Sequence, residues 1–311
     1  MCDFKELLRR NNISELKKIG KVDIHNHAVY SCTKSYLKKM KISIENDKIY
    51  NIQTLIDFSR KYISPIQLKE DGLRILLEGN FENCINNGVK VVCTEIDYKN
   101  CIRTFNSNIE EFISFLKSFK YDNLDIYWNL GISRDSYKEE YKNIIIELLK
   151  TGFFSGIDLT STENIIPNSR FIDFYKIAES IGMYKIVHAG EQLGADYVKQ
   201  CIVDFNPDQI QHGISIIEDI EVMKLAKERS IIFNVCPTSN VVLGYVKDIK
   251  SHPIKKMFEY GLNVTIGTDD LLFFDSNIND EYLKLYNEKV LTEDQLDDIR
   301  RFGLNIYNKK R

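Results

Sequence analysis

The stretch KIVHAGE, residues 185–191, is a short apolar run that ends in a histidine and a glutamate separated by two small residues. Its first half has the composition of a buried β-strand. Nearly continuous apolar strands are typical of parallel sheets that are covered on both faces. The stretch therefore predicts one strand of such a sheet, and seven further runs of this kind occur at 22–27, 89–98, 124–133, 153–161, 209–216, 230–240 and 262–270.

Segments with helical spacing of apolar residues separate these runs. Clear examples lie at 108–119, 141–150, 169–182 and 217–230. The last of these has acidic residues early and basic residues late, which the helix dipole favours. Eight strands alternating with helices in 311 residues is the count of a (β/α)8 barrel, the TIM barrel of the α/β class. We predict a single barrel domain over residues 1–311.

Additional segments fall outside the regular alternation. A long connection, 28–88, follows the first predicted strand and contains the helix-like stretch 51–67. A long loop at this end of a barrel is a common place for a lid over a pocket. The charged start of the chain predicts an extra N-terminal helix. The stretch 291–307 predicts a terminal helix with Thr292 as its N-cap.

Composition argues against several classes of partner. The formal net charge is −3, the pI is about 6.0 and no basic stripe is present, so we expect no nucleic-acid partner. No apolar run is long enough to cross a membrane, and the N-terminus lacks the pattern of a secretion signal. The seven cysteines form no Cys-x-x-Cys pair, which indicates reduced thiols in a cytoplasmic protein. The oligomeric state is not predicted.

Side chains with metal-binding chemistry collect at the predicted strand ends. The carboxyl ends of parallel barrel strands open onto one face, so these residues are expected to meet there. His25 and His27 are two apart on a strand and point the same way. With His188 and one aspartate they supply three nitrogens and one oxygen, which suits Zn²⁺, although Fe²⁺, Mn²⁺ or Co²⁺ also fit. The strand-end residues are His25, His27, His188, His212, Asp269 and Asp270.

This constellation resembles the adenosine deaminase family of the amidohydrolase superfamily. The segment LIDFSRKY, 55–62, is also similar to the lid helix of that family. The resemblance spans most of the chain, and the matching motifs agree in order and rough spacing. They are HNH (25–27), GIDLTSTE (156–163), HAGE (188–191), QHG (211–213), CPTSN (236–240), HP (252–253) and GTDD (267–270).

The resemblance implies zinc-dependent hydrolytic deamination of an adenine-type nucleoside or a related aminopurine, a small-molecule substrate, with release of ammonia. It implies that His25, His27, His188 and Asp269 bind one Zn²⁺ per chain. Glu191 is then the proton carrier beside the substrate ring, and His212 orients and polarises the metal-bound water. Contacts to the substrate are implied for Asp270, Gly190 and the backbone near Ser161.

These roles form a consistent chemistry. Bound zinc lowers the pKa of its water to about 7, which supplies hydroxide at neutral pH. An aromatic carbon that bears an amino group is a poor electrophile until the neighbouring ring nitrogen is protonated. A glutamic acid with a raised pKa can give that proton and later pass it to the departing ammonia.

The sequence departs from the family at positions near the sugar and the purine edge. Val29 stands where family members carry an acidic residue that holds the ribose, so we predict that adenosine is not the best substrate. A nucleoside with an altered or apolar 5′ group, or another aminopurine, is expected instead. Ser161, Gln211 and Leu271 replace a Gly, a Gly and a Pro. Two roles remain open for the apolar residues of the lid segment, which are to cover such a substrate or to pack the lid helix onto the barrel; these residues are Ile52, Leu55, Phe58 and Ile63, and Phe273 and Phe274 are expected to extend the same wall.

Two alternatives remain open. One is another mononuclear metal-dependent amidohydrolase with a non-purine substrate; no lysine is evident at a strand tip, which favours a single metal. The other is a catalytically silent ligand-binding barrel, although neither a predicted ligand nor the acid is missing. A cytidine-deaminase-type enzyme is disfavoured because its signature motifs are absent. His252, in SHPIKK, is interpreted as a structural residue at a helix start.

Overall fold

The structure, a computed structural model, describes residues 3–45 and 47–308. Eight parallel strands pair in sequence order into one sheet. The sheet closes where Asn26 bridges Asp269, and the predicted TIM barrel is confirmed. The strands are β1 (Lys21–His27), β2 (Val89–Asp97), β3 (Asp125–Ser133), β4 (Gly156–Thr160), β5 (Tyr184–Ala189), β6 (Gln209–His212), β7 (Ile232–Val235) and β8 (Asn263–Ile266).

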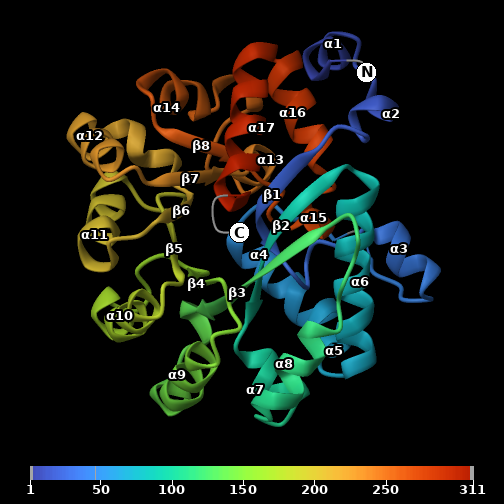
Figure 1. The fold of residues 1–311 in the computed structure, drawn as a ribbon, viewed down its shortest axis with the longest axis vertical. Helices are drawn as coiled ribbons and strands as arrows, with labels where there is room; N and C mark the ends of the chain where they lie inside the picture. The colour runs from blue at the N-terminus through green and yellow to red at the C-terminus, as the bar shows by residue number, and fades with distance from the viewer. Residues whose placement is uncertain (1–2, 46, 309–311) are drawn as a thin grey trace.

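Helices surround the strands on the outside of the barrel (Figure 1). Apolar strand residues such as Val92, Ile157 and Val187 are fully buried. Full burial of a side chain of this size stabilises the fold by about 1.5–3 kcal/mol. From α6 onward the α-helices are α6 (Glu70–Asn86), α7 (Lys99–Thr104), α8 (Ile109–Lys117), α9 (Lys142–Lys150), α10 (Ile172–Ser180), α11 (Ala195–Phe205), α12 (Ile220–Glu228), α13 (Pro237–Val242), α14 (Ile254–Tyr260), α15 (Leu271–Phe274), α16 (Ile278–Asn287) and α17 (Glu293–Asn308).

The connection between β1 and α6 contains a helical lid, as predicted. The lid consists of α4 (Ile52–Phe58), a π-helical turn (Ser59–Ile63) and α5 (Ser64–Gln67), and α3 (Lys34–Lys39) precedes it. The Tyr30 hydroxyl lies 2.8 Å from Ser59 Oγ and so joins the lid to the end of β1. The ring of Phe58 packs edge-on against that of Phe273, with centroids 5.2 Å apart.

The first helix of the chain packs against the last one (Figure 1). The N-terminal helices α1 (Phe4–Arg9) and α2 (Ile13–Leu16) precede β1, and Arg9 Nε donates to Glu293 of α17 at 2.8 Å. Thr292 caps α17 as predicted, since its Oγ1 accepts from Gln295 N at 3.3 Å. Six cysteines are free and buried, and Cys2 lies outside the described residues. Within the described ranges, no helix is both long and apolar enough to span a membrane.

Several strands are shorter than the sequence predicts. Strands β6, β7 and β8 have four residues each. After β6 the chain turns at Gly213, whose φ is +65°, and after β7 the segment that starts at Pro237 forms helix α13. Apolar composition continues past the strand ends because these turns are also buried. The early ends are useful, since they place the last strand residues at the mouth of the barrel.

Candidate active site

A cavity of about 270 Å³ opens at the carboxyl ends of the strands. Its floor includes most of the residues predicted from the strand ends, and its rim is formed by the lid and by the loops after β1, β2 and β3. His25 lies next to the floor, with Nε2 3.6 Å from Asp269 Oδ1. The floor residues are His27, His188, Glu191, His212, Asp269 and Asp270.

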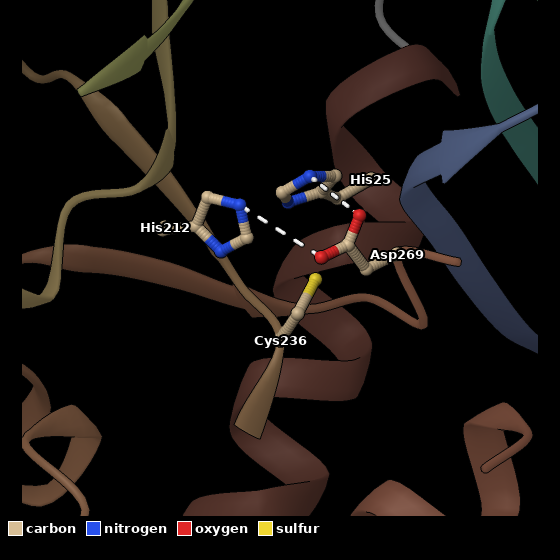
Figure 2. Close-up of side chains that lie close together, drawn as sticks. All are labelled: His25, His212, Cys236 and Asp269. Carbon is tan, nitrogen blue, oxygen red and sulfur yellow. Dashed lines mark ion pairs between the residues drawn. The ribbon is translucent and has the colours of Figure 1, made fainter. Parts of the chain in front are cut away.

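The four predicted metal ligands come together from β1, β5 and the turn after β8. Asp269 Oδ1 lies 3.3 Å from His27 Nε2 as well as facing His25. The His188 ring centroid lies 5.0 Å from that of His25 and 5.2 Å from that of His27. Figure 2 shows His25 and His212 both facing the Asp269 carboxylate. One small volume therefore receives side chains that are far apart in the sequence.

Each of the three predicted histidine ligands has its Nδ1 beside an oxygen at 2.9–3.0 Å. A carbonyl or a carboxylate can only accept, so each Nδ1 carries a hydrogen, and in the neutral ring Nε2 keeps its lone pair. This is the arrangement in which an outer acceptor fixes the tautomer of a metal-binding histidine. The acceptors are Asn234 O for His25, Glu95 Oε2 for His27 and Asp158 Oδ1 for His188.

The donor set fits a divalent metal ion. His25 Nε2 and His188 Nε2 are buried and have no hydrogen-bond partner among the described residues, which is costly unless a ligand occupies the space. Burial lowers the pKa of His25 to about 4 and that of His188 well below its ordinary value, so both rings are neutral. Neutral imidazoles with free lone pairs, together with Asp269, match the preferences of Zn²⁺.

Asp269 is held in place from several sides. Ser239 Oγ donates to Asp269 Oδ2 at 2.6 Å, and Asp269 N donates to His25 O at 2.9 Å. The backbone of Asp269 is left-handed, with φ of +57°, and that of His212 has φ of +61°. Such conformations are unfavourable for non-glycine residues and persist where the surroundings enforce them. Both residues belong to the predicted site.

Cys236 was given no role by the sequence, and it lies beside this group (Figure 2). Its sulfur is within 4.8 Å of the ligand atoms of His25, His212 and Asp269. Burial raises the pKa of the thiol well above its ordinary value. The side chain forms a wall behind the predicted ligands, in agreement with the prediction of a reduced, buried thiol.

Glu191 has the electrostatic environment of a general acid. Its Oε1 accepts from Asn240 Nδ2 at 2.8 Å and lies 3.4 Å from His212 Nδ1. Burial, together with the charges of Asp269 and Glu163, raises the pKa of Glu191 well above its ordinary value. A carboxyl group in such surroundings retains its proton to higher pH and can deliver it to a bound molecule.

The predicted substrate contacts differ in their positions. Asp270 lines the cavity, and its Oδ1 is buried without a partner among the described residues. Ser161 also lines the cavity, with φ of +72°, a conformation that glycine adopts more easily. Gly190 packs behind the cavity, where a Cβ would lie 2.4 Å from Val198 Cγ2. Contact of Gly190 with a substrate stays a prediction.

The apolar rim is smaller than predicted. Val29, Ile52 and Leu55 line the cavity, but Phe58, Ile63, Phe273 and Phe274 do not. These four are buried and pack the lid and α15 onto the barrel. Of the two roles left open for the lid residues, Phe58 and Ile63 therefore have the packing role, and Phe273 and Phe274 add no wall to the cavity. A lysine also lies close to a strand end, contrary to the sequence interpretation: Lys99 follows β2, lines the cavity and lies 3.5 Å from Asp97 Oδ2.

Sequence reasoning missed the acceptors that hold the histidines. Asp158 interrupts an otherwise apolar strand, and this unusual charge was a usable signal. Glu95 lies near the end of β2, and a Cβ at Gly131 would be only 1.3 Å from its Oε1, so that glycine makes room for the carboxylate. Ser239 and Asn240, in the CPTSN segment, also contact site residues and were given no role.

Residues 86–306 match the family model described as adenosine deaminase. The chain is also 30% identical over 279 residues to a Treponema pallidum (strain Nichols) protein that is named provisionally as an adenosine/adenine deaminase. That alignment covers 88% of this chain and 93% of the relative. The protein belongs to the adenosine deaminase family. As a member of this metal-dependent family it is a hydrolytic deaminase.

Solved structures share the barrel of this deaminase. An adenine deaminase from Arthrobacter aurescens has a TM-score of 0.77 and 21% identity, over 94% of this chain and 95% of that one. An amidohydrolase from Burkholderia ambifaria with bound Zn has a TM-score of 0.78 and 19% identity, over 93% and 86%. At these identities the likeness concerns the fold.

Proposed function

We propose that this deaminase catalyses the zinc-dependent hydrolytic deamination of an adenine ring, as a nucleoside or as a related aminopurine, with release of ammonia. The observation that carries the proposal is the position of Glu191. A carboxyl group with a raised pKa lines the same cavity as His188, whose buried Nε2 has no hydrogen-bond partner among the described residues. The names of the relatives, adenosine/adenine deaminase and adenine deaminase, support a purine substrate.

His25, His27, His188 and Asp269 would hold one Zn²⁺. The bound ion would supply a water molecule activated for attack at neutral pH. The Zn-containing relative from Burkholderia ambifaria supports the choice of zinc. These four donors make up one set of ligands for one ion, and we therefore propose a single ion per chain.

The remaining floor residues then handle protons and orientation. Glu191 gives its proton to the ring nitrogen next to the carbon that carries the amino group, and this makes the carbon electrophilic. The water oxygen adds to that carbon, and the carbon–nitrogen bond breaks. Of the two protons released by the water, one leaves with the amino group as ammonia and the other restores the proton of Glu191. His212 and Asp270, whose Oδ1 is unpaired, face the cavity and would orient the water and the substrate.

Ammonia release from a panel of substrates tests the proposal. The panel comprises adenine, adenosine, 5′-deoxyadenosine, 5′-methylthioadenosine and guanine, with cytosine and simple amides as non-purine members. We expect turnover of at least one adenine compound, its loss on chelation and its return with Zn²⁺. Turnover of non-purine members alone would establish another amidohydrolase. Zinc-loaded protein that binds purines without releasing ammonia would establish a silent barrel.

Further properties belong to the same proposal. We propose that residues 1–311 form a single domain and that the enzyme works in the cytoplasm on a small molecule, without nucleic acid or membrane partners. Six buried free thiols support a reducing compartment. The formal net charge of −3 supports the lack of a nucleic-acid partner.

A further inference from the structure

One buried asparagine lies directly behind both groups that are proposed to handle protons. Asn240, in α13, is fully buried. Its Nδ2 lies 2.8 Å from Glu191 Oε1 and 3.1 Å from His212 Nδ1. On the opposite side its Oδ1 lies 3.3 Å from His252 Nε2. The asparagine therefore connects the cavity floor to a histidine that does not line the cavity.

The hydrogen positions along this connection follow from one backbone group. Ile254 N lies 3.1 Å from His252 Nδ1, and a backbone N–H can only donate. His252 Nδ1 is therefore the acceptor, and the neutral ring carries its hydrogen on Nε2. Burial lowers the pKa of His252 to about 3, so the ring is neutral at working pH. The atom of Asn240 that faces Nε2–H must then be the carbonyl oxygen, Oδ1.

This orientation of the amide turns both Nδ2 hydrogens toward the catalytic pair. One is donated to Glu191 Oε1 and the other to His212 Nδ1. Because Oε1 accepts, the proton of the acid resides on Oε2. Because His212 Nδ1 accepts, the neutral His212 carries its hydrogen on Nε2, the nitrogen 3.9 Å from Asp269 Oδ2.

We propose that Asn240 is a positioning residue that directs the proton of Glu191 to Oε2 and that of His212 to Nε2, and that His252 sets the orientation of Asn240. His212 then donates a hydrogen bond to the attacking water oxygen and is not the base that deprotonates it. The meaning of the Glu191 proton rests on the proposed function. The hydrogen-bond chain itself does not.

Nitrogen NMR of protein labelled with ¹⁵N-histidine tests the tautomers directly. The chain has only five histidines, and His212→Gln and His252→Gln identify their signals by loss. We expect the Nε2–H tautomer for both residues in the wild type. In Asn240→Ala we expect His212 to lose its single tautomer. A wild-type His212 with hydrogen on Nδ1, or one unchanged in Asn240→Ala, would overturn the inference.

Kinetics separate positioning from simple packing. A displaced catalytic group typically costs about 10²-fold in rate, so Asn240→Ala should lower kcat by that order. Its KM should change by less than about threefold, because binding contacts remain. His252→Gln keeps a side-chain N–H donor and should retain most activity, whereas His252→Leu should approach Asn240→Ala. Equal activity of the two His252 variants would show that the hydrogen bond from His252 to Asn240 does not orient the amide.

A matched control measures the effect of removing a buried asparagine that does not contact the site. Asn279 of α16 is also fully buried, and its Nδ2 donates to Asn87 O at 3.1 Å, away from the cavity residues. Asn279→Ala should lower the melting temperature and keep kcat. An equal kcat loss in both variants would show a general packing effect and overturn the inference. If no purine is turned over at all, the proposed function fails, and the tautomer measurement still decides this inference.

Discussion

The floor and the rim of the cavity differ in how firmly their side chains are held. On the floor, each predicted metal-binding histidine is buried or nearly so and has an acceptor at 2.9–3.0 Å that fixes its orientation. On the rim, Arg60 and Lys99 make ion pairs of 4.0 and 3.5 Å, and Val29 offers no polar atom to a substrate. The floor matches the deaminase motifs, and the rim departs from them. The family therefore indicates the class of reaction of this protein more firmly than it indicates the substrate.

Burial explains why the floor is the more constrained part. In a site that excludes water, electrostatic interactions are stronger, and an unpaired polar atom is costly. Within the described ranges, His25 Nε2, His188 Nε2 and Asp270 Oδ1 nevertheless have no hydrogen-bond partner, as expected where other molecules bind. Rim side chains remain in contact with solvent and can be exchanged at low cost. Perturbing the floor should therefore have larger effects than perturbing the rim.

The largest effect is expected from the metal. Asp269→Ala removes the only predicted oxygen ligand, so the protein should lose most bound zinc and turnover should fall by more than about 10⁴-fold. Elemental analysis of protein purified without chelator measures the metal, and ammonia release measures the rate. Wild-type protein should contain about one zinc ion per chain. A variant with a full zinc complement and normal turnover would contradict the ligand set.

Glu191→Gln should give the next largest loss. An amide cannot carry the proton, and general acid–base catalysis contributes about 10²–10⁴-fold, so kcat should fall by that order while zinc content stays unchanged. Because the protonated form acts, the wild-type rate should decline as pH rises through the raised pKa of Glu191. The variant should lack this decline. Glu259→Gln, an exposed change on α14, is the control; near-normal turnover of Glu191→Gln would remove the assigned role.

The sequence predicted the floor because rare side chains mark it. Only five histidines are present, and four of them end or follow predicted strands. Asn240 could not be found this way, since its contacts depend on α13 turning back over the cavity. The lid shows a second limit: the π-helical turn Ser59–Ile63 adds a residue to the helical period and changes which face points inward. Ile63 packs in the core, whereas Ile52 lines the cavity.

A smaller effect is expected from the acceptors behind the histidines. Asp158→Asn weakens the acceptor that holds His188 Nδ1 at 3.0 Å. Loss of such an outer contact typically lowers metal affinity about 10–100-fold. Competition with a zinc chelator measures the affinity, and the melting temperature of the zinc-loaded protein reports whether the fold is intact. Unchanged affinity in a folded variant would show that the carboxylate does not support the metal site.

The smallest effect is expected at the rim, and it concerns the choice of substrate. Val29 lines the cavity two residues after His27, and its side chain cannot accept a hydrogen bond from a ribose hydroxyl. A site without that acceptor has no means of favouring the hydroxyl over its absence. Adenosine should therefore not exceed 5′-deoxyadenosine, 5′-methylthioadenosine or adenine in kcat/KM. Val29→Asp should raise the preference for adenosine over 5′-deoxyadenosine by about tenfold, the value of one hydrogen bond to a charged group. Val29→Ala, which adds space without an acceptor, should leave that ratio unchanged. If wild-type adenosine leads the panel, another rim residue must hold the ribose, and the departure at Val29 has no bearing on the substrate.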